Sequence, residues 1–167
     1  MVNDDVSIAV TGTAWMGGGV GSVQSSIEEM LRNATREVQI AVYEITDFDG
    51  FLQLLRSCLA RGVHVTMIIN RYSHHSLRLR NALQELEKRF PHFDLLDFCP
   101  ERESEDLHAK VIVVDHKAAL VGSANMTWKG LVGNHELALR VSGEVASRLG
   151  MLLDKLSEDP RVFSVDK

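Results

Sequence analysis

Short apolar runs alternate along the chain with longer segments in which apolar residues recur every three or four positions. The first pattern is typical of buried strands and the second of amphipathic helices. Strands are predicted near residues 5–10, 38–45, 63–70, 93–98, 107–114, 118–122 and 135–141. Helices are predicted near residues 21–35, 51–60 and 143–157, with a further one that starts at Ser73 or Ser76 and ends at Phe90.

Residues with strong capping preferences flank the two middle helices. Candidate N-cap side chains are Thr46, Asp47 or Asp49 for the first of them, and Ser73 or Ser76 for the second. Gly62 follows the first helix, as a C-terminal glycine does, and Pro91 stops the second. The boundaries of these helices are therefore predicted by local backbone chemistry as well as by periodicity.

The order of the elements predicts the fold class. Alternating strands and helices are typical of an α/β protein with helices on both faces of a sheet. The closely spaced strands after residue 107 indicate hairpins, and hence a mixed sheet. A chain of 167 residues is large enough to bury one core. We expect a single catalytic domain over residues 1–167.

Composition narrows the class of protein. With 45% hydrophobic and 25% charged residues, the chain reads as an ordinary globular protein. A net charge of -5 argues against a broadly basic surface that coats nucleic acid. Cys58 and Cys99 form neither a disulfide framework nor a zinc motif. With no signal peptide or membrane span in view, we expect a cytoplasmic protein without stable membrane association.

A glycine-rich segment after the first strand resembles a nucleotide-binding loop only superficially. Gly17, Gly18, Gly19 and Gly21 do not give the G-x-G-x-x-G spacing, and no lysine follows to complete a phosphate-binding loop. Glu44 lies at the end of the next strand, where a dinucleotide fold would place its acidic residue. We interpret the segment as a flexible turn before the helix.

The stretch LHAKVIVVDHKAALVGSAN, residues 107–125, carries the candidate chemistry. His108 and Lys110 are two residues apart on a predicted strand, so their side chains project from the same face. Asp115 lies about 16 Å further along an extended strand, too far to share one phosphate-sized ligand. Its expected place is the turn that follows, where it bonds nearby backbone amides and fixes the hairpin.

Two more polar residues follow the next predicted strand. Ser123 and Asn125 are again two apart, and a hairpin through the turn at Asp115 would return them to the His108 end of the sheet. A hydroxyl, an amide, an ammonium and an imidazole would then converge there. This set suits an anionic, oxygen-rich ligand, and His108 can accept a proton or attack.

These residues carry a family resemblance. The pattern H-x-K-x4-D-x6-G-S-x-N is similar to the signature of the phospholipase D superfamily; its residues are His108, Lys110, Asp115, Gly122, Ser123 and Asn125. Glu136, eleven residues beyond Asn125, resembles the carboxylate that orients the catalytic histidine in the bacterial nuclease branch. The resemblance spans about residues 22–157, and its specific motifs lie in 107–136.

The resemblance implies metal-independent cleavage of a phosphodiester in two steps, with no cofactor. One histidine attacks phosphorus to form a phosphohistidine, and a second protonates the leaving oxygen and then activates water. Lys110 and Asn125 stabilise charge on the phosphoryl oxygens. Only one H-x-K motif is present. We therefore expect a homodimer in which His108 and the partner's His108 flank the phosphate.

The small size of the chain favours a nucleic-acid substrate, DNA or RNA. The segment NRYSHHSLRLR supplies Arg71 and Arg78, with His74, His75 and Arg80, after a predicted strand, and Trp128 and Lys129 follow Asn125. We expect Arg71, Arg78 and Lys129 to contact phosphates and Trp128 to stack on a base. A solvated helix start, or a Trp128 packed in the core or in a dimer interface, is the alternative. His64, His92, His116 and His135 are expected to have structural or surface roles.

Two other functions stay open at this stage. A lipid phosphodiesterase uses the same chemistry, but no basic amphipathic helix favours it. A non-catalytic nucleic-acid-binding subunit of a larger restriction or defence complex keeps the same fold. The intact His108, Lys110, Asn125 and Glu136 favour the nuclease.

Overall fold

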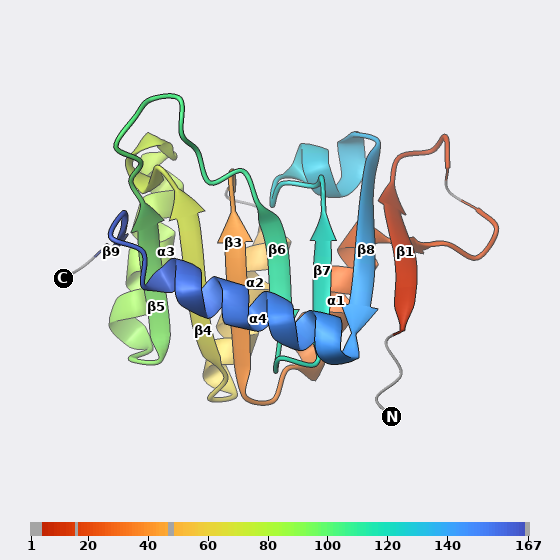
Figure 1. Ribbon diagram of the computed structural model, residues 1–167, viewed down its shortest axis with the longest axis horizontal. Coiled ribbons are helices and arrows are strands. Elements are labelled where there is room, and N and C mark those ends of the chain that lie inside the picture. The colour runs from red at the N-terminus through yellow and green to blue at the C-terminus, as the bar shows by residue number, and fades with distance from the viewer. Residues whose placement is uncertain (1–4, 16, 47–48, 166–167) are drawn as a thin grey trace.

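Nine strands form one continuous sheet in the computed structural model, which describes residues 5–15, 17–46 and 49–165 (Figure 1). The order across the sheet is β2-β1-β8-β7-β6-β3-β4-β5-β9. The strands are β1 Val6–Thr11, β2 Gly21–Ser22, β3 Glu37–Val42, β4 His64–Asn70, β5 Phe93–Phe98, β6 Lys110–Val114, β7 Ala118–Gly122, β8 Glu136–Ser142 and β9 Val162–Ser164.

The sheet is mixed, as the strand spacing predicted. Strands β3, β4 and β5 are parallel to one another, whereas β6, β7, β8 and β1 pair in antiparallel fashion. The parallel pairs need helical crossovers, and the antiparallel β6 and β7 need only a tight turn. The predicted α/β class with a mixed sheet is confirmed.

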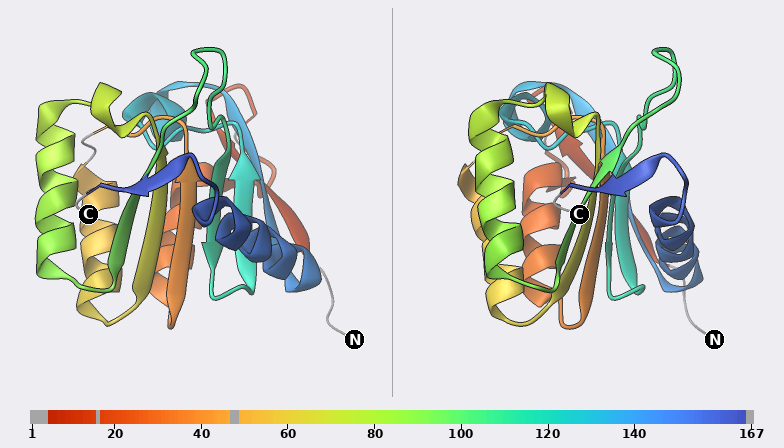
Figure 2. Two further views of the ribbon diagram at one scale, coloured as in Figure 1. Left: turned by 60° about the vertical axis from the view of Figure 1, so that its left-hand side comes forward. Right: turned by 90° about the vertical axis from the view of Figure 1, so that its left-hand side faces the viewer.

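Helices cover both faces of the sheet (Figure 2). The four helices are α1 Val23–Asn33, α2 Asp49–Ala60, α3 Leu77–Arg89 and α4 Gly143–Ser157. Helices α1, α2 and α3 lie on one face, over a core that includes the fully buried Leu31, Leu55 and Leu83. Helix α4 crosses the other face alone, over a smaller core around Val113 and Leu153.

The caps follow the predicted chemistry in part. The Ser76 side chain accepts a hydrogen bond from the Leu79 N–H at 3.3 Å, so Ser76 is the N-cap of α3. Gly62 adopts a φ of 82°, a conformation that favours glycine, just after α2. Helix α2 begins at Asp49, before the predicted start at residue 51, and Asp47 lies outside the described residues.

Several elements differ from the periodic pattern. Strand β6 begins at Lys110, so His108 lies before the strand, whereas the sequence predicted it on the strand. Strand β3 ends at Val42, three residues early. The short strands β2 and β9 and a π-helical turn, Lys129–Gly133, were not predicted. Elements this short contain too few residues to show a periodicity.

Helices that span membranes need about 20 apolar residues, and none of the helices in the described part of the chain is long and apolar enough to do so.

Candidate active site

The polar residues of the motif gather at one edge of the sheet because of strand direction. Strands β3 and β7 end at this edge, whereas β6 and β8 begin there. The register pairs Val42 with Lys110 and Val111 with Val121. Ser123 and Asn125, which follow β7, therefore return to the His108 end of the sheet. The hairpin predicted from the spacing is confirmed.

His108 and Lys110 contact each other directly. The Lys110 ammonium lies 2.9 Å from Nδ1 of His108 and donates to the His108 carbonyl oxygen at 2.8 Å. Tyr43, just beyond β3, supports both side chains: its ring centroid is 4.6 Å from that of His108 and 5.1 Å from the Lys110 Nζ. His108 is exposed, whereas Lys110 is buried. An exposed imidazole therefore lies beside a buried ammonium group.

Burial changes the ionisation of Lys110. Desolvation lowers the pKa of this ammonium, and the nearby carboxylates of Glu136 and Glu44 oppose the change. The net direction is downward, so Lys110 loses its proton at a lower pH than an exposed lysine does. Two acidic side chains thus help to keep a buried cation charged next to His108.

Ser123 and Glu136 form a second pair at the same edge. The Ser123 hydroxyl donates to the Glu136 carboxylate and accepts from the Leu137 N–H at 3.2 Å. Asn134 donates its side-chain amide to the other carboxylate oxygen at 3.1 Å. Within the described residues, the hydrogen bonds of this carboxylate go to Ser123 and Asn134, not to the His108 of its own chain.

Asn125 is held by its backbone neighbours. Residues 45 and 126 form a parallel bridge, and Met126 N–H donates to the Glu44 carbonyl at 3.1 Å. A side chain at Gly130 would collide with the Asn125 backbone, so the close approach of the π-helical turn requires glycine. The Asn125 Oδ1 atom is buried and lacks a hydrogen-bond partner within the described residues.

Asp115 lies at the opposite end of β6 from Lys110, as its distance along the strand predicted. Asp115 and His116 both have a φ of 54°, and they lie in the tight turn of residues 115–117 between β6 and β7. The expected partners were wrong, however. The carboxylate accepts from the backbone N–H groups of Thr35, Arg36 and Glu37, which join α1 to β3, and not from amides of its own hairpin. Asp115 is therefore a structural residue that is remote from His108.

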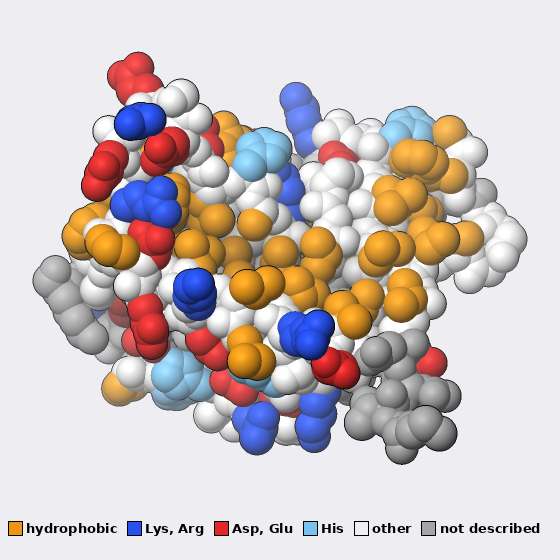
Figure 3. All heavy atoms as spheres, in the orientation of Figure 1, with side chains coloured by type: hydrophobic (Ala, Val, Ile, Leu, Met, Phe, Trp, Pro, Cys, Tyr) orange, Lys and Arg blue, Asp and Glu red, His pale blue; other side chains and the backbone are white. Residues whose placement is uncertain are grey.

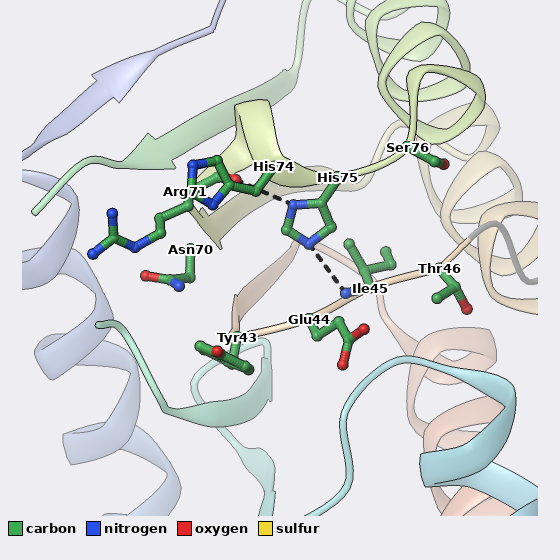
Figure 4. A pocket seen from close by; sticks show the side chains of 9 residues that line it. All are labelled: Tyr43, Glu44, Ile45, Thr46, Asn70, Arg71, His74, His75 and Ser76. Atoms are coloured by element: carbon green, nitrogen blue, oxygen red, sulfur yellow. Dashed lines mark hydrogen bonds between the residues drawn. The ribbon is translucent and has the colours of Figure 1, made fainter. Parts of the chain in front are cut away.

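Two clefts flank Glu44 and Thr46, which line both. The first cleft, of ≈ 340 Å³, is lined also by Tyr43, Asn70, His74, His75 and Ser76, among others (Figure 4). The second, of ≈ 380 Å³, includes Asn125, Trp128, Lys129, Asn134 and Glu136. Trp128 is 58% exposed, and its ring packs directly on Gly133. The predicted positions of Trp128 and Lys129 thus lie beside the motif.

The predicted phosphate contacts of Arg71 and Arg78 receive less support from the geometry. The Arg71 guanidinium extends away from Glu44 (Figure 4) and binds Asp106, with 2.7 Å between Nε and Oδ1. Its charge is therefore already paired within the chain. Arg78 lies exposed in the first turn of α3, outside the cleft that Arg71 lines.

His75 lines the first cleft and is half-buried. Its Nε2 accepts from the Ile45 N–H at 3.4 Å, and its Nδ1 donates to the Arg71 carbonyl at 3.3 Å. Burial lowers the pKa of His75, which favours the neutral ring. This histidine fixes the ends of β3 and β4 relative to each other.

Four further histidines contact different parts of the fold. His64 binds Asp94 at 2.7 Å, His92 donates to the Leu59 carbonyl, and His135 accepts from the Ala14 N–H. His116 lies near Glu37 and Asp154. Within the described residues, no three His, Cys, Asp or Glu side chains form a group that could hold a metal ion. The metal-independent mechanism stays a prediction.

Three site residues were missed by motif analysis. Tyr43, Glu44 and Asn70 follow or end parallel strands β3 and β4. Polar residues at the carboxyl ends of parallel strands often line binding crevices. That rule, applied to the end of each predicted strand, could have identified them.

Comparison with known proteins gives one family. The family model described as "Cardiolipin synthase, PLD-like domain" matches residues 27–155. A DISARM protein, DrmC, from Bacillus paralicheniformis is 28% identical over 120 residues, which cover 71% of this chain and 49% of that protein. The chain thus spans about half the length of this relative.

Solved structures agree on the fold. NucT from Helicobacter pylori superposes with a TM-score of 0.79 at 20% identity, and the match covers 97% of this chain and 99% of that one. Nuc from Salmonella typhimurium, a phospholipase D family member, gives 0.75 at 18% identity with the same coverage. Phosphatidylserine synthase from Haemophilus influenzae gives 0.73 at 12%, over 97% of this chain and 40% of that one.

Proposed function

Because the chain belongs to the phospholipase D-like domain family, as its motif predicted, we propose that it is a metal-independent phosphodiesterase that cleaves nucleic acid. The observation that carries the proposal is the contact of an exposed His108 with the buried Lys110 ammonium, 2.9 Å away. Glu136 and Asn125 lie at the same edge of the sheet. A reachable nucleophile beside a fixed positive charge suits attack on a phosphodiester.

The proposed reaction has two steps. A ring nitrogen of one His108 attacks phosphorus, a P–N bond forms, and the P–O bond to the leaving nucleoside breaks. The other His108 donates its proton to the leaving oxygen. It then takes a proton from water, whose oxygen attacks phosphorus and breaks the P–N bond. Lys110 and Asn125 bind the non-bridging oxygens in both steps.

A second copy of the chain would supply the second histidine. The chain has one H-x-K motif, and the two-step reaction needs two imidazoles. In one chain, Glu136 hydrogen-bonds with Ser123 and Asn134. We expect this carboxylate to orient His108 of the partner subunit, which would complete a site at a two-fold axis.

The surface on the α4 side of the sheet fits this role. Tyr43 alternates with Val42 and so projects on the same face as Ala41, which packs in the core beneath α4. His108 contacts Tyr43 at the edge of the sheet. Hydrophobic side chains gather on the same face (Figure 3). They include four exposed residues of β1 and β8: Val6, Ile8, Leu137 and Leu139.

The exposed apolar area supports association with another protein surface. Ile8 and Leu139 are cross-strand partners, 53% and 41% exposed. On α4, three more apolar side chains are exposed: Val145, Met151 and Leu152. The second copy is the occupant that the incomplete site requires.

Nucleic acid is the proposed substrate because the second cleft combines an exposed indole with an exposed ammonium. Trp128 and Lys129 line it together with Asn125. A stacking surface beside a phosphate-binding cation is the usual arrangement for single strands. The similarity to DrmC, a DISARM protein, supports a role within a larger defence complex.

The test is cleavage of labelled single- and double-stranded DNA and RNA in EDTA, with phosphatidylcholine hydrolysis assayed in parallel. We expect cleavage of nucleic acid by the wild type and none by His108→Ala. Quenching in alkaline denaturant, in which the P–N bond of a phosphohistidine survives, should trap wild-type protein that carries the cleaved strand on His108. Full activity of His108→Ala, or loss of all cleavage in EDTA, would contradict the mechanism. Turnover of lipid alone would change the substrate class, and silence on all substrates would favour a binding role.

A further inference from the structure

Arg71 has a dense set of contacts with the segment that leads to His108. Besides the 2.7 Å bond from its Nε to Asp106, its Nη2 donates to the carbonyls of Arg102, Glu103 and Glu105, at 3.3, 3.0 and 3.3 Å. Its side chain is only 22% exposed. One guanidinium thus binds four residues of a loop that rises above the sheet edge between β5 and β6 (Figures 1 and 2).

Asn70, the last residue of β4, extends these contacts toward His108. Its side-chain amide donates to the Asp106 carboxylate at 3.1 Å and accepts from the Leu107 N–H at 2.9 Å. Asn70 is 4% exposed and Leu107 is 8% exposed. A buried amide that satisfies a backbone donor fixes the chain at that point. The point lies one residue before His108.

His108 has little other backbone support on this side. Strand β6 begins at Lys110, and residues 105–109 are outside any helix or strand. Loops carry catalytic groups well only when a rigid scaffold positions them. Here the scaffold is the end of β4, in the parallel part of the sheet.

We propose that Asn70 and Arg71 are positioning residues, which hold Asp106 and Leu107 against the end of β4 and so set the place of His108; this inference rests on the proposed function. The Asn70–Arg71–Asp106 cluster is called the clamp below. The hydrogen bonds from Arg71 and Asn70 lower the pKa of the Asp106 carboxyl, which favours the ionised carboxylate that both side chains bind.

The clamp and a phosphate-binding Arg71 predict opposite effects of one substitution. Removal of the Asp106 carboxylate breaks the clamp, so kcat should fall. If Arg71 instead bound substrate phosphate, Asp106→Ala would free its charge and lower KM. The two roles also differ in Arg71→Ala: a lost clamp lowers kcat, whereas a lost phosphate contact raises KM and weakens the salt dependence of binding.

The first experiment is steady-state cleavage in EDTA by Arg71→Ala, Asp106→Ala and the double variant. We expect kcat to fall about 10- to 100-fold in each, since small displacements of a reacting group cost rates of this order, with KM within about twofold of wild type. The double variant should lose less than the product of the two single losses, because the Arg71–Asp106 bond is removed in both single variants. Arg71→Lys should recover part of the rate, since a lysine can still pair with Asp106.

Arg140→Ala is the matched control. Its guanidinium binds Glu29 at 3.0 Å, and its side chain is 32% exposed, but it lies on the α1 face. It should leave kcat unchanged. A second measurement needs no turnover: the ring resonances of His108, identified by their loss in His108→Ala, should shift or broaden in Arg71→Ala and stay in place in Arg140→Ala.

The outcomes separate the two proposals. Unchanged kcat and unchanged His108 resonances in Arg71→Ala and Asp106→Ala, with His108→Ala inactive, would overturn the clamp and leave the nuclease intact. A lower KM in Asp106→Ala would overturn it in favour of phosphate binding. Full cleavage by His108→Ala would overturn the proposed function, and the resonances would then decide the clamp alone.

Discussion

The carboxylate of Asp115 and the backbone of Thr35 are joined across 80 residues of sequence. Thr35 donates both its N–H, at 3.0 Å, and its hydroxyl, at 2.8 Å, to the same carboxylate oxygen. The second oxygen accepts from the next two backbone amides, of Arg36 and Glu37. The motif aspartate therefore ties the β6–β7 turn to the start of β3, and its contribution is to stability.

Asp115→Asn should destabilise the fold by roughly 2 to 3 kcal/mol, since a buried carboxylate is replaced by a group with one acceptor. Burial would raise the pKa of Asp115, but the hydrogen bonds from Glu37, Arg36 and Thr35 outweigh it and lower that pKa. The wild type therefore keeps this stabilisation above about pH 4, the unfolded value, and loses it as the pH falls through the lowered pKa. Urea unfolding at several pH values measures both effects.

The control for this prediction is Asp94→Asn, which removes an exposed pair with His64. Exposed pairs contribute at most about 1 kcal/mol. If Asp115→Asn is no less stable than Asp94→Asn at pH 7, Asp115 does not hold the turn.

The Lys110 ammonium should set the alkaline limit of activity. Since burial lowers its pKa, kcat/KM should decline at a pH below the value of about 10.4 that is usual for lysine. Glu44→Gln removes a negative charge that stabilises the ammonium, so the alkaline decline of kcat/KM should move to lower pH. A pH profile of cleavage measures it. Glu29→Gln, on α1, should leave the alkaline decline of kcat/KM at the same pH. If the decline also stays at the same pH in Glu44→Gln, Glu44 does not influence the ionisation of Lys110.

Motif spacing predicted the arrangement of the site well where the backbone is regular. Ser123 and Asn125 return to the His108 end of the sheet because β6 and β7 form a hairpin with a tight turn, and Asp115 was expected at this turn. The helix α4, residues 143–157, and the strand β5, residues 93–98, were predicted to the residue. Periodicity and turn chemistry act locally, so one sequence reveals them.

Contacts between distant segments could not be read in the same way. The sequence shows Arg71 in a basic stretch, and only the folded chain brings Asp106 and three carbonyls to its guanidinium. Likewise, the partners of Asp115 lie at Thr35 to Glu37 because α1 ends beside the hairpin. The sequence shows which residues are polar and how they are spaced. Tertiary packing decides which of them are paired within the chain and which remain available for a ligand.

Trp128 and Lys129 should contribute to binding in different ways. In a His108→Ala background, which prevents cleavage, Trp128→Ala should weaken binding of single-stranded oligonucleotides by about 1 to 3 kcal/mol, the usual value of one stacked base. Lys129→Ala should instead reduce the slope of log Kd against log salt by about 1, the value of one lost phosphate contact. Fluorescence anisotropy at several salt concentrations separates the two effects.

Trp15→Ala is the control for the indole. Trp15 is 43% exposed, but it donates its Nε1–H to the Thr11 carbonyl and lies beside His135. It should leave oligonucleotide binding unchanged. Equal losses in Trp15→Ala and Trp128→Ala would mean that the second cleft does not hold the substrate strand.

The dimer interface can be tested on the cross-strand pair Ile8 and Leu139. These side chains lie opposite each other on β1 and β8, and both are exposed on the α4 side of the sheet. Ile8→Glu with Leu139→Glu places two like charges on that face, so the copies should separate. Light scattering should then show a monomer, and cleavage should fall at least about 100-fold, because a monomer lacks the second histidine of acid–base catalysis.

The matched control is Leu77→Glu, an equally apolar and 64% exposed position on α3, which packs on the opposite face. It should remain dimeric and active. Circular dichroism must show that both proteins are folded. Raising the concentration of the double variant should restore activity in step with the dimer fraction, because only the composite site brings two His108 rings to one phosphate. A folded monomer that cleaves at the wild-type rate would refute the shared site, and the second histidine would then have to be sought within one chain.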